Sequence, residues 1–212
     1  MKYHELLVEI GCEEMPASWL PGITRQLESR LVFRLDEARI TSGTQAVGFN
    51  TPRRLGVSVE NLADRQRDLK ETVTGPPVSV AFDIDGAPRA AAEGFARQHG
   101  VTLEALTRIE TPKGEYLTYH RLRRGRTTRA VLAGILAATL RDLVFPKRMR
   151  WDAVLSDGHE EFTFGRPIRW LLFLYGGKVV PFVIGRTPAA LSAGVKPIRS
   201  GDVTYGHRFF SR

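Results

Sequence analysis

The sequence predicts an α+β fold of mostly antiparallel sheets with packed helices, in one or two subdomains. Three observations lead to this class. Short β-rich segments recur along the chain and are joined by Gly- and Pro-containing turns of hairpin length. Between them lie segments whose apolar residues recur at helical spacing. The chain has 212 residues, of which 42% are hydrophobic, and this is enough for a sizeable core in one large or two small domains.

Residues 1–64 are predicted to form a β-α-β-β unit. A β-rich segment over 3–10 precedes a segment over 17–39 whose apolar residues stand close to helical spacing. Two further β-rich segments follow over 44–49 and 55–62.

The stretch 65–77 is polar and closes on Gly75-Pro76-Pro77, so it is expected to be a connector. Residues 78–212 are predicted to form a basic α+β region, either separate from residues 1–64 or packed with them as one domain. Its expected elements are a helix over 87–99, a hairpin over 108–122, a helix that begins at Thr127 or Thr128 and stops before Pro146, and a hairpin of strands 168–175 and 179–184.

The formal net charge of +8 is unevenly distributed along the chain. Residues 1–112 carry 13 basic and 16 acidic side chains, a net charge of −3, whereas residues 113–212 carry 18 and 7, a net charge of +11. A basic face most often meets a polyanion, with RNA first among the candidates. The alternative is that the arginines only form a solvated surface in an Arg-rich protein.

Several kinds of site are excluded or disfavoured by the sequence. Cys12 is the only cysteine, which excludes an internal disulfide and favours a reduced, cytoplasmic setting. No apolar run approaches the ~20 residues of a membrane helix, and the N-terminus lacks a signal-peptide layout, so no membrane partner is expected. The five histidines are scattered, so no metal site is predicted. No catalytic residue is assigned, because the chain lacks a nucleophile elbow, a Walker A sequence and a dinucleotide fingerprint.

The adjacent carboxylates Glu13 and Glu14 allow two interpretations. Paired carboxylates can hold split pKa values for acid–base chemistry, which would suit a stand-alone hydrolase. They also suit the positive end of a helix that begins near Pro16. The capping role is favoured, because adjacent residues on a strand-to-helix turn point in different directions.

Four clusters of arginine and lysine stand beside aromatic residues and prolines, over 51–54, 145–151, 164–170 and 206–209. Guanidinium groups bind phosphate with forked hydrogen bonds and aromatic rings stack on bases, so the clusters predict RNA contacts. The candidate residues are Arg53, Arg54, Lys147, Arg148, Arg150, Arg166, Arg169, His207 and Arg208. The alternative is that these cations stack on Trp or Phe inside the fold, or pair across an interface with Glu13, Glu14, Glu160 or Glu161.

Eight motifs carry a resemblance to a known family. They are LLVEIGCEEMPA (6–17), TPRRLGV (51–57), GPP (75–77), AFDIDGAPRAAAEGFARQHGV (81–101), KGEYL (113–117), FPKRMRW (145–151), FGRPIRW (164–170) and GHRF (206–209). In order and spacing the chain resembles the N-terminal region of the beta subunit of bacterial two-subunit glycyl-tRNA synthetase. The departures are Cys12, Met15, Asp152 and Gly165, where the family tends to have Thr, Leu, Gly and Val.

The resemblance implies that the chain is the N-terminal fragment of a longer subunit, which continues into regions similar to an HD domain and an anticodon-binding domain. It implies an aminoacyl-tRNA synthetase whose separate alpha subunit activates glycine with ATP and Mg, so the fragment itself is expected to bind no cofactor. The implied partners are the alpha subunit, glycine tRNA and a second beta subunit in an α2β2 assembly in the cytoplasm. The nine candidate residues then become candidates for tRNA binding.

Two roles fit such a fragment. The first is to support tRNA binding and aminoacylation with the catalytic alpha subunit, through basic clusters that face solvent. The second is a non-catalytic protein–protein scaffold, whose basic and aromatic motifs are structural and do not touch RNA. The burial and the partners of the clustered arginines distinguish the two.

Overall fold

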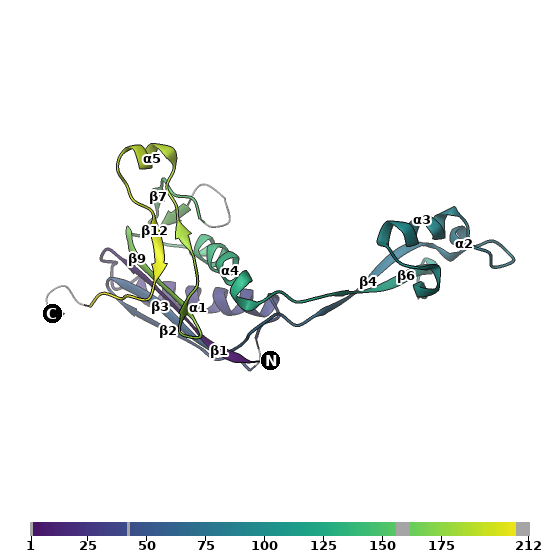
Figure 1. The fold of residues 1–212 in the computed structure, drawn as a ribbon. Helices are drawn as coiled ribbons and strands as arrows, with labels where there is room; N and C mark the ends of the chain where they lie inside the picture. Colours follow the sequence, from purple (N-terminus) through teal and green to yellow (C-terminus); the bar gives the residue numbers. More distant parts are fainter. Residues whose placement is uncertain (1, 42, 156–161, 207–212) are drawn as a thin grey trace. The chain divides into compact units, whose positions relative to one another are not determined.

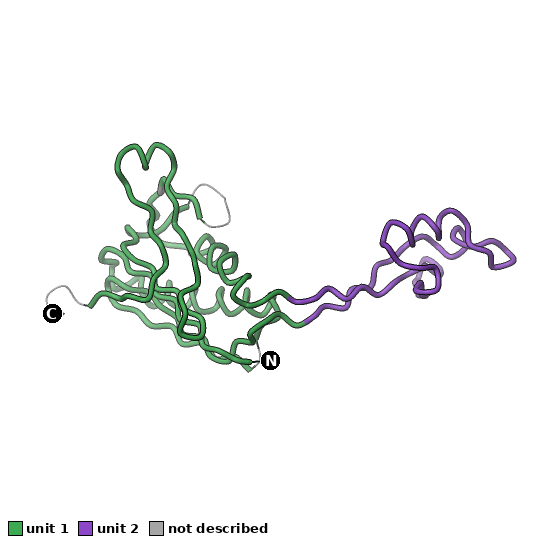
Figure 2. The backbone as a smooth tube through the Cα atoms, viewed as in Figure 1, with its two compact units in different colours: residues 1–67, 126–212 green, residues 68–125 purple. Residues whose placement is uncertain are grey.

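The computed structural model describes residues 2–41, 43–155 and 162–206, and the chain divides into two compact units (Figure 2). Unit 1 comprises residues 1–67 and 126–212, and unit 2 comprises residues 68–125. This division differs from the predicted ranges. Residues 126–212 belong with the N-terminal segment because β9 (Ile168–Tyr175) pairs with β1 (Tyr3–Cys12) along its whole length.

The stretch 65–77 also differs from the expected connector. It contains β4 (Leu69–Pro77), which pairs antiparallel with β6 (Gly114–Arg123). Half-buried and exposed residues alternate along β4 from Leu69 to Thr74. The polar composition therefore belongs to a strand with one face in solvent, rather than to a loop.

The main sheet of unit 1 is mostly antiparallel. Its strands run in the order β11-β12-β9-β1-β3-β2, with β10 added to β9, and only the β12–β9 pair is parallel. The remaining strands are β2 (Ala46–Thr51), β3 (Arg54–Ala63), β10 (Lys178–Val179), β11 (Val183–Ile184) and β12 (Ile198–Gly201).

The alternation of side chains along β1 shows which face of this sheet packs against the hydrophobic core. Leu6, Val8 and Ile10 are fully buried, and Val8 stands opposite Val57 on one side and Phe173 on the other. Two helices, α1 (Leu20–Glu37) and α4 (Thr128–Asp142), cover this face (Figure 1). Because successive side chains of a strand point to opposite faces, Glu9 and Gly11 lie on the other face of the sheet.

Both long helices bury the apolar stripe that the sequence predicts. The stripe of α1 contains Ile23, Leu27, Leu31 and Leu35, and that of α4 contains Leu132, Leu136 and Leu140. The helices contact each other, and Arg34 of α1 forms an ion pair with Asp142 of α4. Helix α4 ends four residues before Pro146, as predicted. The arrangement of helices and mostly antiparallel sheets confirms the predicted α+β class.

The predicted capping role of Glu13 and Glu14 is wrong. Helix α1 begins at Leu20 with Trp19 as its N-cap residue, and no acidic residue lies in its first turn. Residues 17–19 form a turn held by a hydrogen bond from the Trp19 N–H to the Pro16 carbonyl. Pro21, rather than Pro16, occupies the first turn of the helix, and this turn displaces the two carboxylates from the positive end of α1.

The C-terminal part of unit 1 is built from short strands. β7 (Met149–Trp151) pairs with β8 (Phe162–Phe164), and α5 (Pro188–Ser192) follows β11. The predicted strand 179–184 is interrupted at Pro181, which has no N–H to give to a ladder. Its first part pairs with β9 and its second part with β12.

Unit 2 combines a three-stranded sheet with short helices. The sheet has the order β4-β6-β5, and β5 (Thr107–Thr111) with β6 forms the predicted hairpin. Around a small core of Phe95, Leu117 and Tyr119 lie α2 (Val78–Ala81), α3 (Ala90–His99) and the 3-10 helix η1 (Leu103–Ala105). No helix in the described part of the chain is long and apolar enough to cross a membrane.

Candidate nucleic-acid interface

The turn between β2 and β3 presents the first basic cluster, Arg53 and Arg54. Two backbone hydrogen bonds tie this turn to the chain that leaves β1. The Cys12 N–H donates to the Arg53 carbonyl at 2.9 Å, and the Met15 N–H donates to the Pro52 carbonyl at 2.7 Å. The arginines of the turn are therefore held on ordered backbone next to Glu13 and Glu14.

The Arg54 side chain is bound by other residues of the fold. Its Nε lies 3.2 Å from Oε1 of Glu9, a carboxylate that is only 6% exposed. The same oxygen accepts hydrogen bonds from the Trp170 indole N–H at 2.8 Å and from the Thr204 hydroxyl. Arg54 also donates to the Tyr205 carbonyl at 2.5 Å. Burying a charge is costly unless it is paired and hydrogen-bonded, and these donors satisfy Glu9.

Gly11 makes room for this network. A Cβ atom at position 11 would lie 1.9 Å from two ring carbons of Trp170, so the indole lies directly against the backbone of β1. Gly11 and Trp170 are paired residues on adjacent strands, which places the indole next to Glu9. The glycine is required for close packing, in the manner expected of glycine inside a strand.

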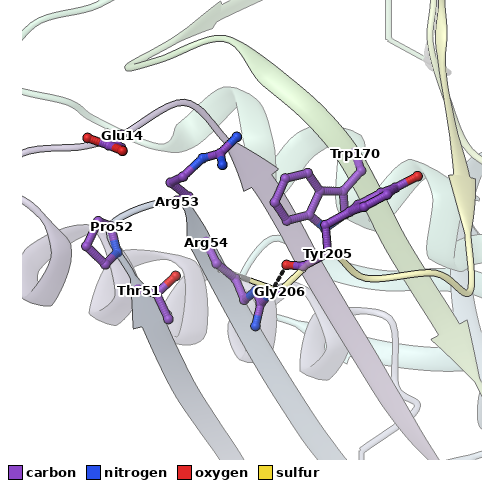
Figure 3. A pocket seen from close by; sticks show the side chains of 8 residues that line it. All are labelled: Glu14, Thr51, Pro52, Arg53, Arg54, Trp170, Tyr205 and Gly206. Carbon is purple, nitrogen blue, oxygen red and sulfur yellow. Dashed lines mark hydrogen bonds between the residues drawn. The ribbon is translucent and has the colours of Figure 1, made fainter. Parts of the chain in front are cut away.

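A pocket of about 340 Å³ opens beside this network (Figure 3). Its lining residues are Glu14, Thr51, Pro52, Arg53, Arg54, Trp170, Tyr205 and Gly206. The rings of Trp170 and Tyr205 meet edge to face, with centroids 5.2 Å apart. The Arg53 guanidinium points into the space between Glu14 and Trp170 (Figure 3). Within the described residues, its Nε is buried and has no hydrogen-bond partner.

Arg166 and Arg169 tie the third cluster to the segment after β1. Arg166 Nε donates to the Glu14 carbonyl at 3.0 Å, and its guanidinium lies 5.7 Å from the centroid of the Trp19 ring. Arg169 Nε donates to Oε1 of Glu13 at 2.5 Å. These two arginines and Arg54 therefore have partners within the fold, as the alternative of pairing and stacking predicts.

The second cluster faces solvent. Lys147, Arg148 and Arg150, in β7 and just before it, have exposed side chains. Lys147 and Arg148 form no ion pair within the residues that the structure describes. Arg150 lines a hollow of about 320 Å³ together with Arg169 and Arg186.

The sequence prediction missed Arg186. Its Nε donates to the Lys196 carbonyl at 3.1 Å, and burial lowers the pKa of its guanidinium from the ordinary value. Gly185-Arg186-Thr187-Pro188 repeats the pairing of arginine with glycine and proline found at Gly165-Arg166-Pro167, and this pattern could have identified it. The structure thus brings the second and third clusters to one hollow and leaves the first in the pocket beside Trp170. His207 and Arg208 lie outside the described residues.

The two carboxylates proposed for acid–base chemistry do not share a pocket. Glu13 is engaged by Arg169, whereas Glu14 lines the pocket beside Arg53. No group of three or more potential metal ligands lies close together in the described part of the chain. Glu13 and Glu14 are therefore not arranged as an acid–base pair in one pocket.

Taken together, these observations define an α+β protein in which the clustered arginines of unit 1 either have partners within the fold or line surface hollows. Residues 6–212 match the family described as "Glycyl-tRNA synthetase beta subunit", and the chain belongs to this family.

Curated relatives give the same result. The chain is 41% identical over 96% of its length to a glycine–tRNA ligase beta subunit from Nitratidesulfovibrio vulgaris, and it covers 26% of that protein. It is also 41% identical over 98% of its length to the Anaeromyxobacter dehalogenans subunit, of which it covers 27%. The identity to the Syntrophus aciditrophicus subunit is 41% over 97% of the chain, again 27% of the relative. The chain thus spans about a quarter of the length of these relatives.

Proposed function

We propose that this chain is the N-terminal portion of the beta subunit of a glycine–tRNA ligase and supports tRNA binding and aminoacylation together with a catalytic alpha subunit. The family match and the names of the relatives support the ligase and its two-subunit composition. ATP with Mg belongs, in this proposal, to the alpha subunit, and the assembly contains two copies of each subunit in the cytoplasm. The chain contributes binding surface and supplies no reacting group.

The observation that carries the tRNA proposal is the location of the charge. Unit 2 contains 8 basic and 8 acidic residues and is formally neutral, whereas unit 1 contains 23 and 15, which gives the whole net charge of +8. A locally cationic surface attracts the phosphate backbone of RNA and releases its counterions. Lys147 and Arg148 are exposed and are not neutralised by a described acidic residue, so they are the best candidates for phosphate contacts.

The double variant Lys147→Ala/Arg148→Ala tests this proposal. Loss of two phosphate contacts should weaken tRNA binding by about tenfold at moderate salt and should reduce the slope of log K against log[salt] by roughly 1.5. The measurement is a tRNA titration at several salt concentrations. The matched control is Arg97→Ala/Lys113→Ala, which removes two exposed cations from neutral unit 2 and should leave both quantities unchanged. Equal binding by the Lys147/Arg148 variant and the unmodified chain would refute a direct role of these residues.

A scaffold role is the second candidate, and one observation favours it. Arg54, Arg166 and Arg169 are bound to Glu9, to the Glu14 carbonyl and to Glu13, so three of the predicted tRNA contacts brace the fold. A scaffold predicts that the chain captures the alpha subunit and fails to retain tRNA. Separate pull-downs with the alpha subunit and with glycine tRNA, each at two salt concentrations, distinguish these roles.

A further inference from the structure

Three arginines of unit 1, none of them in the four basic clusters, are brought together by backbone hydrogen bonds. The Arg67 N–H donates to the Arg39 carbonyl at 3.1 Å, and the Gln66 N–H donates to the Arg126 carbonyl at 2.9 Å. The Gln66 side-chain amide also donates to the Ala38 carbonyl at 2.9 Å. Three stretches that are far apart in the sequence therefore lie side by side, and each contributes one arginine to the same part of the surface.

The side chains of these arginines are held by main-chain carbonyls. Arg39 Nε donates to the Arg67 carbonyl at 3.1 Å, and Arg67 Nη2 donates to the Thr41 carbonyl at 3.3 Å. Arg126 Nη2 donates to the Ala130 carbonyl at 3.2 Å. A carbonyl orients a guanidinium without neutralising its charge, and a guanidinium has five N–H donors, so each of the three keeps donors for a ligand.

Carboxylates do not neutralise this group. None of the three arginines forms an ion pair within the residues that the structure describes. Arg67 and Arg126 are exposed, and the third is half-buried. Glu37 lines a hollow of about 470 Å³ together with Arg126, and Asp36 accepts a hydrogen bond from the Thr41 hydroxyl at 2.6 Å. Crowded like charges repel one another, so an anionic ligand would stabilise this surface.

Arg39 adds a backbone observation. It follows Ala38, the C-cap residue of α1, with a φ of 58°, a left-handed conformation in which glycine is favoured. The hydrogen bond to the Arg67 carbonyl and the negative end of α1 offset part of the conformational cost of an arginine there. Substitution by glycine therefore separates the role of this side chain in binding from its role in the backbone.

The arrangement of these groups narrows the class of ligand. Anchoring by a carbonyl is not sufficient, since Arg25 Nε also donates to the Pro21 carbonyl, at 3.3 Å. The distinguishing feature is the convergence of three charges from separate stretches, which suits an anion with several charged groups along its length. Guanidinium groups match phosphate oxygens with forked hydrogen bonds. None of the described residues that line the hollow beside Arg126 is aromatic, so the surface suits a phosphate backbone rather than stacked bases.

We propose that Arg39, Arg67 and Arg126 bind the phosphate backbone of RNA. Each guanidinium keeps its hydrogen bond to a carbonyl and donates its remaining N–H groups to phosphate oxygens. RNA as the polyanion rests on the proposed function, but the surface shares no residue with Lys147 and Arg148. Because phosphate contacts carry no sequence information, an RNA duplex of arbitrary sequence binds here.

Binding of a short labelled RNA duplex to the 212-residue chain, followed by fluorescence anisotropy at several salt concentrations, tests the proposal. Arg67→Gln/Arg126→Gln should weaken duplex binding by about tenfold at moderate salt and reduce the slope of log K against log[salt] by roughly 1.5. Arg67→Lys/Arg126→Lys retains both charges, so it should keep the salt slope and lose only the part of the affinity that depends on forked hydrogen bonds.

The matched control is Arg25→Gln/Arg199→Gln, which removes two exposed arginines elsewhere in unit 1 and changes the net charge equally. It should change duplex affinity by less than about twofold. Glu37→Gln should tighten binding, because a negative charge beside Arg126 is removed. Thermal unfolding of each variant verifies that the fold is retained.

Arg39→Gly distinguishes a binding role from a structural one. It should weaken duplex binding by about threefold, since one phosphate contact is lost. It should not lower the unfolding temperature, because glycine is favoured in the conformation of residue 39. A lower unfolding temperature with unchanged duplex binding would show that the Arg39 side chain is structural and would remove it from the surface.

The possible outcomes separate this surface from the proposed function. Unchanged duplex binding by the Arg67/Arg126 glutamine variant, or no duplex binding by the unmodified chain, overturns the surface even if Lys147 and Arg148 are needed for tRNA binding. Loss of duplex binding in that variant alone supports the surface, whatever the Lys147/Arg148 variant does. Displacement of the duplex by polyglutamate as readily as by unlabelled RNA overturns RNA as the ligand and indicates an acidic protein segment.

Discussion

Glu9 is the residue on which the organisation of the candidate interface depends. It is a carboxylate 6% exposed on a central strand, and one of its oxygens is approached by groups from Arg54, Trp170 and Thr204. These donors come from β3, from β9 and from the chain after β12, so a single oxygen holds three separate segments together. Because Arg54 satisfies this charge, it is a structural residue, whereas Arg53 next to it remains available.

The burial of Cys12 should make the stability of the protein depend on pH. It is fully buried at the end of β1, and burial raises the pKa of its thiol from about 9 to about 12, although Arg53 opposes the shift. The folded chain therefore keeps the thiol proton at a pH at which the unfolded chain loses it. Stability is unaffected below about pH 9 and should fall between about pH 9 and 12, at up to about 1.4 kcal/mol per pH unit from this group.

Urea unfolding at a series of pH values, compared with Cys12→Ala, measures this effect. The difference between the two pH profiles isolates the thiol from the tyrosines and lysines that titrate in the same range. In a parallel assay at pH 8, a disulfide exchange reagent should modify Cys12 only after unfolding, since the thiolate is the nucleophile. Fast modification of the folded chain would show that the thiol is not protected.

At the scale of elements, the sequence predicted the helices and the hairpin of β5 and β6, but not the pairing of strands far apart in the chain. Residues at helical spacing in α1 and α4 form the buried stripes, since a helix needs only one apolar face to find its place. Strand β1 is expected from its β-rich sequence, but its pairing with β9 joins residues more than 150 positions apart, and local sequence carries no record of it. The same long-range pairing explains why residues 1–64 are not a separate unit.

The separate cores of the two units lead to a prediction about stability. Leu136 of α4 is fully buried in the core of unit 1, and Phe95 of α3 is 8% exposed in the core of unit 2. Truncation to alanine should cost about 2–5 kcal/mol at Leu136 and about 3–5 kcal/mol at Phe95, from lost burial and the cavity left behind. Hydrogen exchange should show faster exchange in unit 1 for Leu136→Ala and in unit 2 for Phe95→Ala.

An exposed leucine supplies the control for this comparison. Leu122 of β6 is 55% exposed, so Leu122→Ala should change stability by less than about 0.5 kcal/mol. If Phe95→Ala accelerated exchange in α1 and α4 as strongly as in α3, the two cores would unfold as one.

At the scale of the whole chain, the net positive charge lies in unit 1, which a comparison of the two halves of the sequence does not show. Division at residue 112 places a net charge of −3 before +11, yet unit 2 is inserted within unit 1 and is itself neutral. In the candidate interface, too, the sequence alone did not show which residues come together in the fold. Sequence motifs identified Arg53 and Arg54 as equivalent, whereas in the described residues Arg54 forms an ion pair with Glu9 and Arg53 forms none. Motifs report which residue types occur together, and only tertiary contacts decide which of them stay available to a ligand.

Because unit 2 is inserted between two segments of unit 1, its removal tests whether unit 1 folds without it. The chain leaves unit 1 after Arg67 and returns at Arg126, and these two points are adjacent within unit 1. The Gln66 N–H donates to the Arg126 carbonyl at 2.9 Å, and the Arg126 N–H donates to the Gln66 side-chain oxygen at 3.1 Å. The next residues continue the contact, since the Thr128 N–H donates to the Asp64 carbonyl at 2.9 Å. A short Gly/Ser turn can therefore replace residues 68–125 without moving the ends.

Such a shortened chain should fold, unfold cooperatively on heating and keep the near-UV circular dichroism of its buried aromatic residues, because the core of unit 1 contains no residue from 68–125. It also retains the net charge of +8, so its tRNA affinity and salt dependence should match those of the unmodified chain if unit 1 forms the interface. A folded product that has lost tRNA binding would place the contacts in unit 2 instead. An unfolded product would show that unit 1 depends on the insertion, since the two ends that the turn must join already lie side by side.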